Sequence, residues 1–393
     1  MSIIIFAVTL LLVMSAIFYG LAPWRKVAAY ETRTTGLEAL PKISVVAYAL
    51  RDEDDLEEYI DILLAQDYPD FEVILVCDAS AEASAMISEK YENVSNLHVT
   101  FIPPGSHNLS RRKLAQTLGI KRASGDVVVT TSTSVKPRSD KWLRAMAEPF
   151  ADSEINIACG YVHPTFADYK GPAKWYRQMD NVLTSAQWMA SAIDGHPYRG
   201  DGYNLAFRRR LFFEVKGYSS SLTLVDGDDD IFITSISTGS DGVLVLNPDS
   251  FVDTQWESEA NRMHVEYKDR YAFTRKYLPK APFIRAASLA WAQWFSLAAL
   301  IGIVMTALPE IFSLKAGASS EISSIVTLGL AMLCVIGFWL YEIMTYRRLA
   351  SRLEAVRLFW GVIPFMLWRP VGNFIFFLNH YPSRKSHYTW IRH

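Results

Sequence analysis

The residues best suited to chemistry are three consecutive aspartates, Asp228, Asp229 and Asp230, within the sequence Gly-Asp-Asp-Asp-Ile-Phe. Carboxylates at contact distance repel one another, so such a run is costly unless the side chains are solvated, bound to a metal or held by hydrogen-bond donors. Like-charged neighbours also raise the pKa of a carboxylate towards the range in which it can accept a proton from a hydroxyl group. The alternative interpretation is an acidic helix N-terminus, which the helix dipole favours, and the two interpretations are compatible.

A pattern of alternating strands and helices precedes these aspartates. Short runs rich in β-branched residues predict four strands, at residues 43–48, 71–76, 97–102 and 126–131. Amphipathic stretches at residues 56–64 and 112–123 predict helices between them. This alternation predicts a largely parallel, doubly wound α/β sheet. Ligands of such sheets bind beyond the carboxyl ends of the strands, where Asp78 and the segment Thr131–Ser134 fall.

The composition excludes few functions, but it divides the chain. The 393 residues carry a formal net charge of -2, which gives no electrostatic argument for a nucleic-acid partner. The cysteines Cys77, Cys159 and Cys334 have neither the spacing of a metal site nor that of a disulfide framework, and they suit a reducing compartment. Most charged residues lie in the middle of the chain, whereas both ends are apolar and aromatic.

Apolar runs long enough to cross a bilayer lie at Ile3–Leu21, Ala286–Leu308 and Ile322–Ile343. The first has no positive charge before it and no small-residue cleavage site after it, which favours an uncleaved anchor over a signal peptide. Basic residues follow the first run, precede the second and follow the third, whereas the linker between the second and third holds one lysine. The positive-inside rule therefore predicts that the region from Arg25 to Arg285 faces the cytoplasm.

A further apolar stretch, Leu358–Leu378, is interrupted by Arg369-Pro370. Proline removes a backbone donor, and an arginine in the middle of a membrane is costly. We therefore predict an interfacial or re-entrant pair of helices here, within a C-terminal segment of residues 355–393, and not a clean fourth span. The tail with Arg384 and Lys385 would rest on the cytoplasmic membrane surface, where anionic lipids attract cations.

Ordered blocks of sequence lie between Ile43 and Tyr277. They are Ile43-Ser44-Val45-Val46 with Val76-Cys77-Asp78-Ala79-Ser80, then Arg112-Lys113-Leu114-Ala115, then Gly202-Tyr203-Asn204-Leu205-Ala206-Phe207-Arg208 with Gly227-Asp228-Asp229-Asp230-Ile231-Phe232, and finally Tyr267-Lys268-Asp269-Arg270-Tyr271. In this order they resemble the family 2 glycosyltransferases, most of all a membrane-anchored bacterial branch. The resemblance implies a GT-A fold, with a Rossmann-like, mostly parallel sheet and flanking transmembrane helices.

The resemblance also implies residues on the nucleotide side of a site. Asp78 takes the position of the family's aspartate that holds the uracil of a UDP-sugar, although Asp-Ala-Ser is also ordinary turn chemistry. Lys113 takes the position of a lysine near the nucleotide, or it is a solvated helical cation. Arg270 suits a diphosphate because its planar guanidinium group donates paired hydrogen bonds.

The family's acidic pair maps to Asp228 and Asp229. In an inverting transferase one carboxylate takes the proton of the acceptor hydroxyl as it attacks the anomeric carbon, and we assign this role to Asp229. Asp228 is predicted to orient the acceptor, and Asp230, Asn204 and Tyr271 are predicted to bind it as well.

The family's metal motif is missing from this sequence. Relatives place Asp-x-Asp after the fourth strand to hold Mg²⁺ or Mn²⁺ against the diphosphate, whereas this chain has Ser132-Thr133-Ser134. Hydroxyl groups are poor lone ligands for such hard cations, so we predict Ser132 and Ser134 to be nucleotide-side residues and name no metal ligand. Three explanations stay open: metal-independent transfer that uses Arg270, Lys113 or neighbouring cations, a metal held elsewhere, or a catalytically silent chain.

The sequence thus predicts an anchor at residues 1–23, a GT-A domain at 30–277, transmembrane helices at 286–308 and 322–343, and the segment 355–393. The predicted function is inverting transfer of a sugar from a nucleotide-sugar donor, UDP-linked by resemblance, to a lipid-linked or envelope polysaccharide acceptor. The predicted location is the cytoplasmic face of the bacterial inner membrane. The alternative is a silent pseudo-glycosyltransferase that acts as a membrane scaffold.

Overall fold

The computed structural model describes residues 2–32, 40–49, 56–78, 81–102, 110–165, 171–255, 260–315 and 322–380. Sequence features at residues 51–55, 79–80 and 381–393, including the basic tail, lie outside the described residues. The chain forms two compact units. One consists of Met1–Ala29, Lys170–Ala190 and Lys280–Asn379, and the other of Tyr30–Tyr169, Ser191–Pro279 and His380–His393.

The second unit is built on a seven-stranded sheet in the order β3-β2-β1-β4-β8-β6-β9. Its strands are β1 (Ile43–Ala49), β2 (Phe71–Cys77), β3 (Leu97–Phe101), β4 (Val127–Ser132), β6 (Ile157–Cys159), β8 (Leu205–Arg208) and β9 (Gly242–Leu244). Strand β8 is antiparallel to β4 and β6, and the other pairs are parallel. The predicted α/β fold and its four strands are confirmed.

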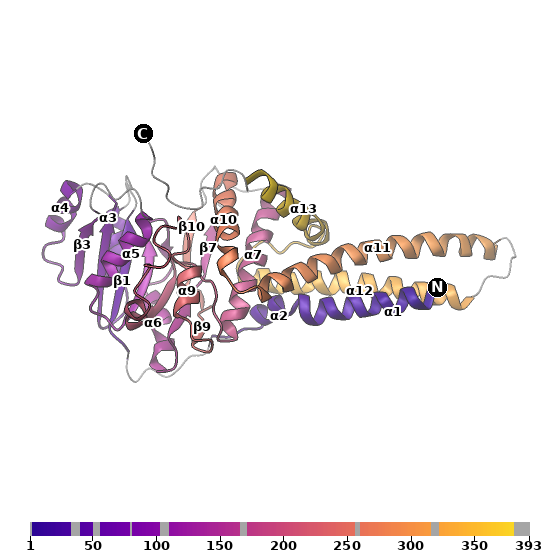
Figure 1. Ribbon diagram of the computed structural model, residues 1–393, viewed down its shortest axis with the longest axis horizontal. Helices are drawn as coiled ribbons and strands as arrows, with labels where there is room; N and C mark the ends of the chain where they lie inside the picture. The colour runs from indigo at the N-terminus through magenta and orange to yellow at the C-terminus, as the bar shows by residue number, and fades with distance from the viewer. Residues whose placement is uncertain are drawn as a thin grey trace. The chain divides into compact units, whose positions relative to one another are not determined.

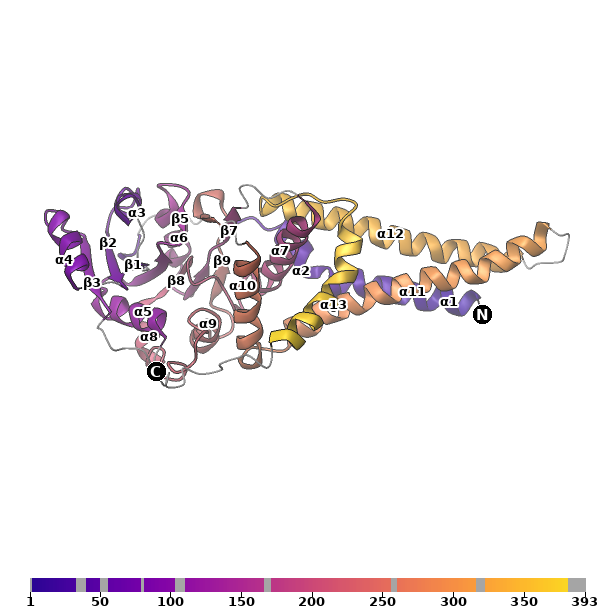
Figure 2. The ribbon, with the colours of Figure 1, turned by 90° about the horizontal axis from the view of Figure 1, so that it is seen from above.

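Helices cover both faces of this sheet, so β1 and β4 are buried along their whole length. On one face, α3 (Leu56–Leu64) and α6 (Trp142–Ala147) pack on the odd-numbered residues of β1 and β4. On the other face lies α5 (Arg111–Arg122), which contacts β1 and β2. Gly119 allows this approach, because a Cβ there would lie 2.4 Å from Val46 Cγ1. Figure 2 shows α3 and α6 on the opposite side of the sheet from α5.

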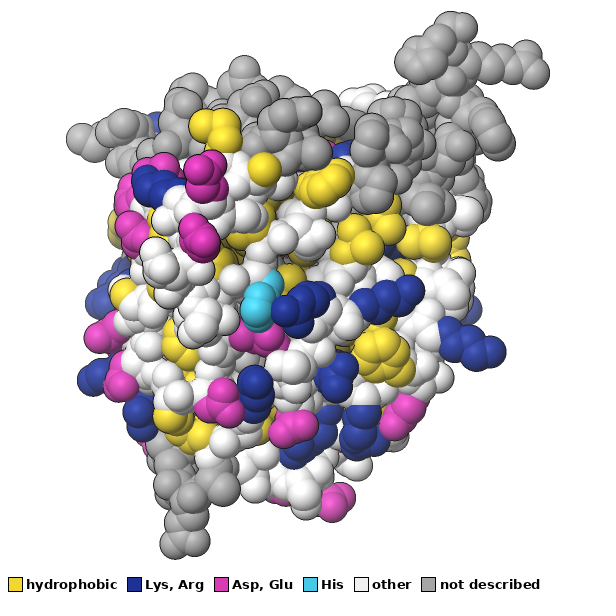
Figure 3. All heavy atoms as spheres, turned by 90° about the vertical axis from the view of Figure 1, so that its left-hand side faces the viewer, with side chains coloured by type: hydrophobic (Ala, Val, Ile, Leu, Met, Phe, Trp, Pro, Cys, Tyr) yellow, Lys and Arg dark blue, Asp and Glu magenta, His cyan; other side chains and the backbone are white. Residues whose placement is uncertain are grey.

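Shorter elements complete this unit (Figure 1). They are the helices α4 (Ala81–Lys90), α8 (Arg209–Glu214), α9 (Asp230–Ile236) and α10 (Ala260–Thr274), the 3-10 helices η2 (Glu148–Ala151), η3 (Pro248–Ser250) and η4 (Arg275–Tyr277), and a small sheet of β5 (Lys136–Pro137), β10 (Val252–Gln255) and β7 (Val162–Thr165). On the face of the molecule in Figure 3, acidic and basic side chains are interspersed, in agreement with the small net charge.

The first unit is helical. It contains α1 (Ser2–Ser15), the π-helix η1 (Ala16–Gly20), α2 (Ala22–Ala28), most of α7 (Pro172–Ile193), α11 (Ala281–Lys315), α12 (Ile322–Arg352) and α13 (Val362–His380). In the part of the chain that the structure describes, four helical stretches are long and apolar enough to cross a membrane, at Ile3–Gly20, Ala281–Pro309, Ser324–Arg352 and Val362–Asn379. The first three overlap the predicted apolar runs almost completely. Helices α1, α11 and α12 pack side by side.

The predicted break at Arg369-Pro370 is wrong, because α13 is one continuous helix through both residues. Proline removes only one backbone hydrogen bond, and neighbouring contacts can offset that loss. Arg369 is paired within its own unit: its Nε lies 2.6 Å from Asp180 Oδ1, and its Nη2 donates to Thr184 Oγ1 at 3.1 Å. The arginine charge is therefore neutralised where the sequence alone shows only a cation in an apolar run.

Candidate active site

The three aspartates lie at the start of α9, immediately after Gly227. This glycine has a φ of +102°, a backbone conformation that glycine adopts without strain. Asp229 is the N-cap residue, and its Oδ1 accepts a hydrogen bond from the backbone N–H of Asp230 at 2.8 Å. The helix N-terminus interpretation is therefore correct, and it leaves Asp229 Oδ2 available to other partners.

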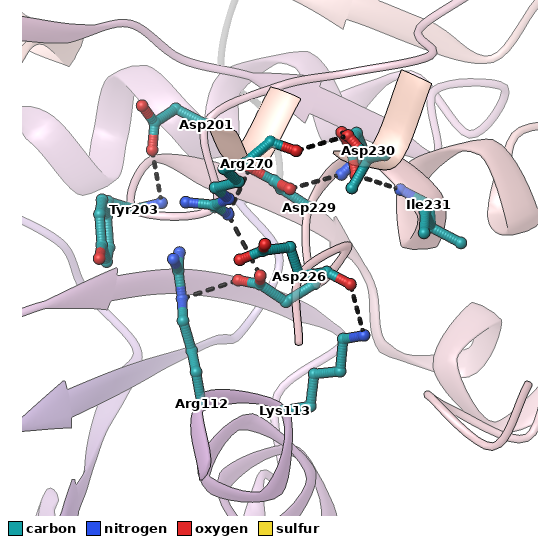
Figure 4. Close-up of polar contacts among 12 residues, drawn as sticks. Arg112, Lys113, Asp201, Tyr203, Asp226, Asp229, Asp230, Ile231 and Arg270 are labelled. Carbon is teal, nitrogen blue, oxygen red and sulfur yellow. Dashed lines mark hydrogen bonds and ion pairs between the residues drawn. The ribbon is translucent and has the colours of Figure 1, made fainter. Parts of the chain in front are cut away.

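Two guanidinium groups neutralise the first two aspartates (Figure 4). Arg270 of α10 donates from Nη2 to Asp229 Oδ2 at 2.7 Å and to Asp228 Oδ1 at 3.2 Å. Arg112 of α5 pairs through Nε with Asp228 Oδ2 at 2.7 Å, and its guanidinium carbon lies 4.0 Å from the centre of the Tyr203 ring. Burial alone would raise the pKa of Asp228, but Arg112 and Arg270 outweigh it and hold that pKa below its usual value.

Both arginines keep unused donors in this buried cluster. Arg112 Nη2 and Arg270 Nε have no hydrogen-bond partner among the described residues. Gly202 leaves room for the Arg112 guanidinium group, since a Cβ at this position would lie 2.8 Å from Arg112 Nη2. Buried N–H donors without acceptors are costly, and charged guanidinium donors suit the oxygens of a phosphate group. The arrangement therefore favours an anionic ligand beside Asp228 and Asp229.

Two further carboxylates of the cluster hold protons more tightly than usual. Burial raises the pKa of Asp201 to about 6, with Arg270 opposing the shift and Asp229 adding to it. Burial and the Asp229 charge raise the pKa of Asp230 to about 6. Asp230 is fully buried and binds Thr274 Oγ1 and Arg199, so it links α9 to α10 and does not face an acceptor as predicted. Tyr271, which is also predicted to bind the acceptor, stacks on Arg199, with the guanidinium carbon 3.9 Å from the centre of the ring.

The contacts of Lys113 also contradict its predicted place on the nucleotide side of the site. Its ammonium group donates to the backbone carbonyls of Ser221 at 2.6 Å, Leu224 at 3.2 Å and Asp226 at 2.8 Å, and the side chain is fully buried. Burial lowers its pKa to about 8, although Asp228 opposes the shift. Three acceptors use all three N–H donors, which leaves none for a nucleotide. Its neighbour Arg112, which the sequence reasoning missed, reaches the aspartates instead.

Replacing Lys113 with methionine is expected to lower the free energy of unfolding by about 1–3 kcal/mol, because buried carbonyls lose their donor. Nucleotide affinity should stay nearly unchanged. Denaturation in detergent and calorimetric titration measure the two effects, and Lys121→Met at the exposed end of α5 is the matched control. A large loss of nucleotide affinity without a loss of stability would restore the original assignment.

Asn204 is likewise a structural residue and not an acceptor ligand. Its Oδ1 accepts from Trp142 Nε1 at 3.0 Å, and its Nδ2 donates to the carbonyls of Tyr161 at 3.0 Å and Ser250 at 2.8 Å. The side chain is fully buried. Its amide therefore joins β8 to segments next to the small sheet.

Three of the predicted nucleotide-side residues, Asp78, Ser132 and Ser134, lie at or just beyond the carboxyl ends of β2 and β4. Asp78 follows β2, and its carboxylate accepts from Tyr48 Oη at 2.8 Å and from Arg111 Nε at 2.8 Å. Ser132 ends β4 with a fully buried side chain, and Ser134 is two residues further on. The sequence reasoning also missed Arg111, whose pairing occupies the Asp78 carboxylate.

Part of this chain is similar to a known protein family. Residues 44–216 match the model of a family described as Glycosyl transferase family 2. This stretch of the α/β domain is therefore similar to that family. No curated protein sequence matches the chain.

Two solved structures align with most of this chain. Mannosyltransferase PcManGT from Pyrobaculum calidifontis, in complex with GDP-Man and Mn²⁺, aligns with a TM-score of 0.50 and 16% identity, over 84% of this chain and 98% of that one. TarS 1–349 from S. aureus, in complex with UDP-GlcNAc, aligns over 84% of this chain and 92% of that one at 15% identity, with a TM-score of 0.41. At 16% identity the likeness to the mannosyltransferase shows a shared GT-A fold.

The end of β4, where the resemblance implies metal ligands, has no carboxylate side chain at residues 132–134. It presents the hydroxyl groups of Ser132, Thr133 and Ser134, which are neutral. Within the described ranges, no group of three or more His, Cys, Asp or Glu side chains is placed to hold a metal ion. The charges closest to the acidic pair are those of Arg112 and Arg270.

Proposed function

We propose that the α/β domain is an inverting glycosyltransferase that moves a sugar from a nucleotide-sugar donor to an acceptor hydroxyl. The observation that supports this most is the pair Asp228–Asp229 at the start of α9, bound by Arg270 and Arg112. The pair combines a carboxylate for proton transfer with guanidinium groups for a leaving diphosphate.

Asp229 is the proposed general base. The acceptor oxygen forms a bond to the anomeric carbon as the bond from that carbon to the diphosphate oxygen breaks. The hydroxyl proton passes to Asp229, and the nucleoside diphosphate leaves with the electron pair. Asp229 keeps its hydrogen bond from the Asp230 backbone through Oδ1, so Oδ2 is the oxygen that accepts the proton.

Arg270 is the proposed link between donor binding and this base. Without a donor, it pairs with Asp229 Oδ2 at 2.7 Å, which keeps the base occupied. A diphosphate competes for the same guanidinium group, so donor binding draws Arg270 from Asp229 and frees the carboxylate. Arg112, whose Nη2 has no acceptor among the described residues, would share the diphosphate charge. The arginines then supply the charge that the family otherwise obtains from a metal ion.

The finer assignments rest on the resemblance and the membrane helices. We propose a UDP-linked donor, with Asp78, Ser132 and Ser134 on its nucleotide side, and Asp228 and Tyr271 near the acceptor. The flanking apolar helices favour an acceptor held at a membrane, either lipid-linked or a growing envelope polysaccharide. The distribution of basic residues favours the cytoplasmic face of a bacterial inner membrane.

Calorimetric titration of the detergent-purified full chain with UDP and with GDP, each with and without Mn²⁺, tests the proposal. We expect a nucleoside diphosphate to bind with an affinity that changes less than about threefold with Mn²⁺, because guanidinium groups carry the charge. Binding that requires Mn²⁺ would overturn the metal-independent mechanism. No binding of either nucleotide would favour the silent scaffold over the enzyme.

A further inference from the structure

Length and composition alone would allow helix α13 to be a fourth span, because Val362–Asn379 is long and apolar enough to cross a membrane. Its direction argues against that role. Within the helical unit, α1, α11 and α12 run alongside one another, whereas α13 runs across the direction of α11 and α12 (Figure 2). A helix that crosses the direction of neighbouring spans lies nearer the plane of a membrane than its normal.

Contacts with α7 hold α13 in this direction. The Arg369 guanidinium group pairs with Asp180 at 2.6 Å, and the Phe365 ring meets the Tyr176 ring edge to face with centroids 5.6 Å apart. Just before α13, the Val356 backbone N–H donates to Gln178 Oε1 at 3.2 Å. Phe365 and Arg369 lie about one helical turn apart, so these contacts attach the N-terminal half of α13 to α7.

Helix α7 is too polar to enter the hydrocarbon of a bilayer. Its sequence contains Lys174, Arg177 and Asp180, and it is not among the helices apolar enough to span. A spanning α13 would carry the Asp180–Arg369 pair and this stretch of α7 towards the membrane interior. Charged side chains there cost several kcal/mol each, of order 2.5–3.5 on the lowest scales. Because α7 stays outside the hydrocarbon of the bilayer, α13, which is attached to it, stays outside as well.

The other side of α13 still requires an apolar environment. Trp368 is 51% exposed, Phe374 62%, Phe377 45% and Leu378 54%, and Trp360 just before the helix is 87% exposed. Aromatic side chains in such positions are typical of helices that lie in the membrane–water interface. Helices α1, α11 and α12 belong to the same unit and are apolar enough to span a bilayer, so a bilayer would lie next to this face.

We propose that α13 is a membrane-surface helix: it docks on α7 through Arg369 and inserts its exposed aromatic face into the lipid leaflet on the side of the α/β domain. The chain then crosses the membrane three times, and its C-terminus lies on the same side as residues 30–279. The occupant of the exposed face is the lipid bilayer. This inference does not depend on the proposed sugar transfer.

Topology reporters fused to the full chain in a bacterial host test the number of crossings. Green fluorescent protein fluoresces only in the cytoplasm, and alkaline phosphatase is active only outside it. We expect a fusion after His393 to be fluorescent and phosphatase-inactive, like a fusion inserted in the α/β domain, and a fusion after Lys315 to give the opposite pattern. Phosphatase activity after His393 would mean that α13 spans the membrane and would overturn the proposal.

Fluorescence quenching in vesicles tests the contact with lipid. Bromine near the headgroup end of the acyl chains should quench the fluorescence that Trp368 contributes, defined as the difference between the wild type and Trp368→Phe. Bromine near the chain ends should quench this contribution less. Trp188→Phe removes a buried indole of α7 and should leave the quenching unchanged. No quenching of the Trp368 contribution, or stronger quenching by deep bromine, would contradict a surface position.

Discussion

Replacing Asp229 with asparagine is expected to lower the rate of sugar transfer by about 10²–10⁴-fold, the usual contribution of a general base. An amide cannot take the proton of the acceptor hydroxyl. The amide oxygen can still accept the hydrogen bond from the Asp230 backbone at the start of α9, so the helix should remain capped. Initial rates with a radiolabelled donor, together with calorimetric nucleotide affinities, measure the effect.

The control for this variant is Asp226→Asn, which removes a negative charge from the same region. Only the backbone carbonyl of Asp226 binds Lys113, and that contact survives the substitution. Its transfer rate should stay within about threefold of the wild type, because the substitution lies in a loop, outside the reacting groups. If Asp229→Asn lost transfer and nucleotide binding to the same degree, Asp229 would be a ligand-binding residue and not the base.

Replacing Arg270 with methionine is expected to lower the free energy of unfolding by about 3–5 kcal/mol, because it leaves buried carboxylates without a cation. Asp229 is 1% exposed and would lose the cation 2.7 Å from its Oδ2, while Asp228 would keep only Arg112. Chemical denaturation of the full chain in detergent measures the loss. Nucleotide affinity should fall as well, since Arg270 is the proposed diphosphate ligand.

The decrease in the free energy of unfolding caused by Arg270→Met is expected to depend on pH. In the wild type the pKa of Asp228 lies below its ordinary value of 3.8, so its charge stabilises the fold above that pH and this contribution is lost as the pH falls. Without Arg270 the pKa of Asp228 rises, and protonation relieves the buried charge at a higher pH. The difference between variant and wild type should therefore shrink as the pH falls from 7 towards 4.

An exposed ion pair provides the matched control for Arg270→Met. Lys90 and Glu57 pair on the surface with side chains 52% and 62% exposed, so Lys90→Met should cost less than about 1 kcal/mol. A similar cost for both variants would mean that the Arg270 pairs are no more than a surface interaction.

The sequence patterns predict the elements of this fold well because each pattern has a direct physical cause. A strand covered on both faces favours consecutive apolar residues, and β4 begins with three valines, residues 127–129. The spans follow from length and apolarity alone. The acidic run after Gly227 stands out because its repulsion requires solvent, a metal or hydrogen-bond donors, although the pattern does not tell which of these is present.

The sequence alone does not predict roles that depend on how a helix is rotated about its axis or on partners far away in the chain. Adjacent side chains on a helix point about 100° apart, so a motif that matches Lys113 cannot tell whether Lys113 or Arg112 faces Asp228. The packing of Gly119 on Val46 determines that rotation, and it exists only once α5 lies on the sheet. The partner of Arg369 is 189 residues away in sequence, which no local pattern can supply.

Helix α7 has a practical consequence for producing the catalytic domain. Although residues 170–190 lie in the middle of the predicted 30–277 domain, they belong to the helical unit. A polypeptide truncated to residues 30–277 would lose Arg369 and Phe365, the partners of Asp180 and Tyr176. Asp180 is 3% exposed in the intact chain, so the truncation would bare a face of α7 that is otherwise buried. Such a fragment is prone to aggregate during expression, so the enzyme is better purified with its membrane helices attached.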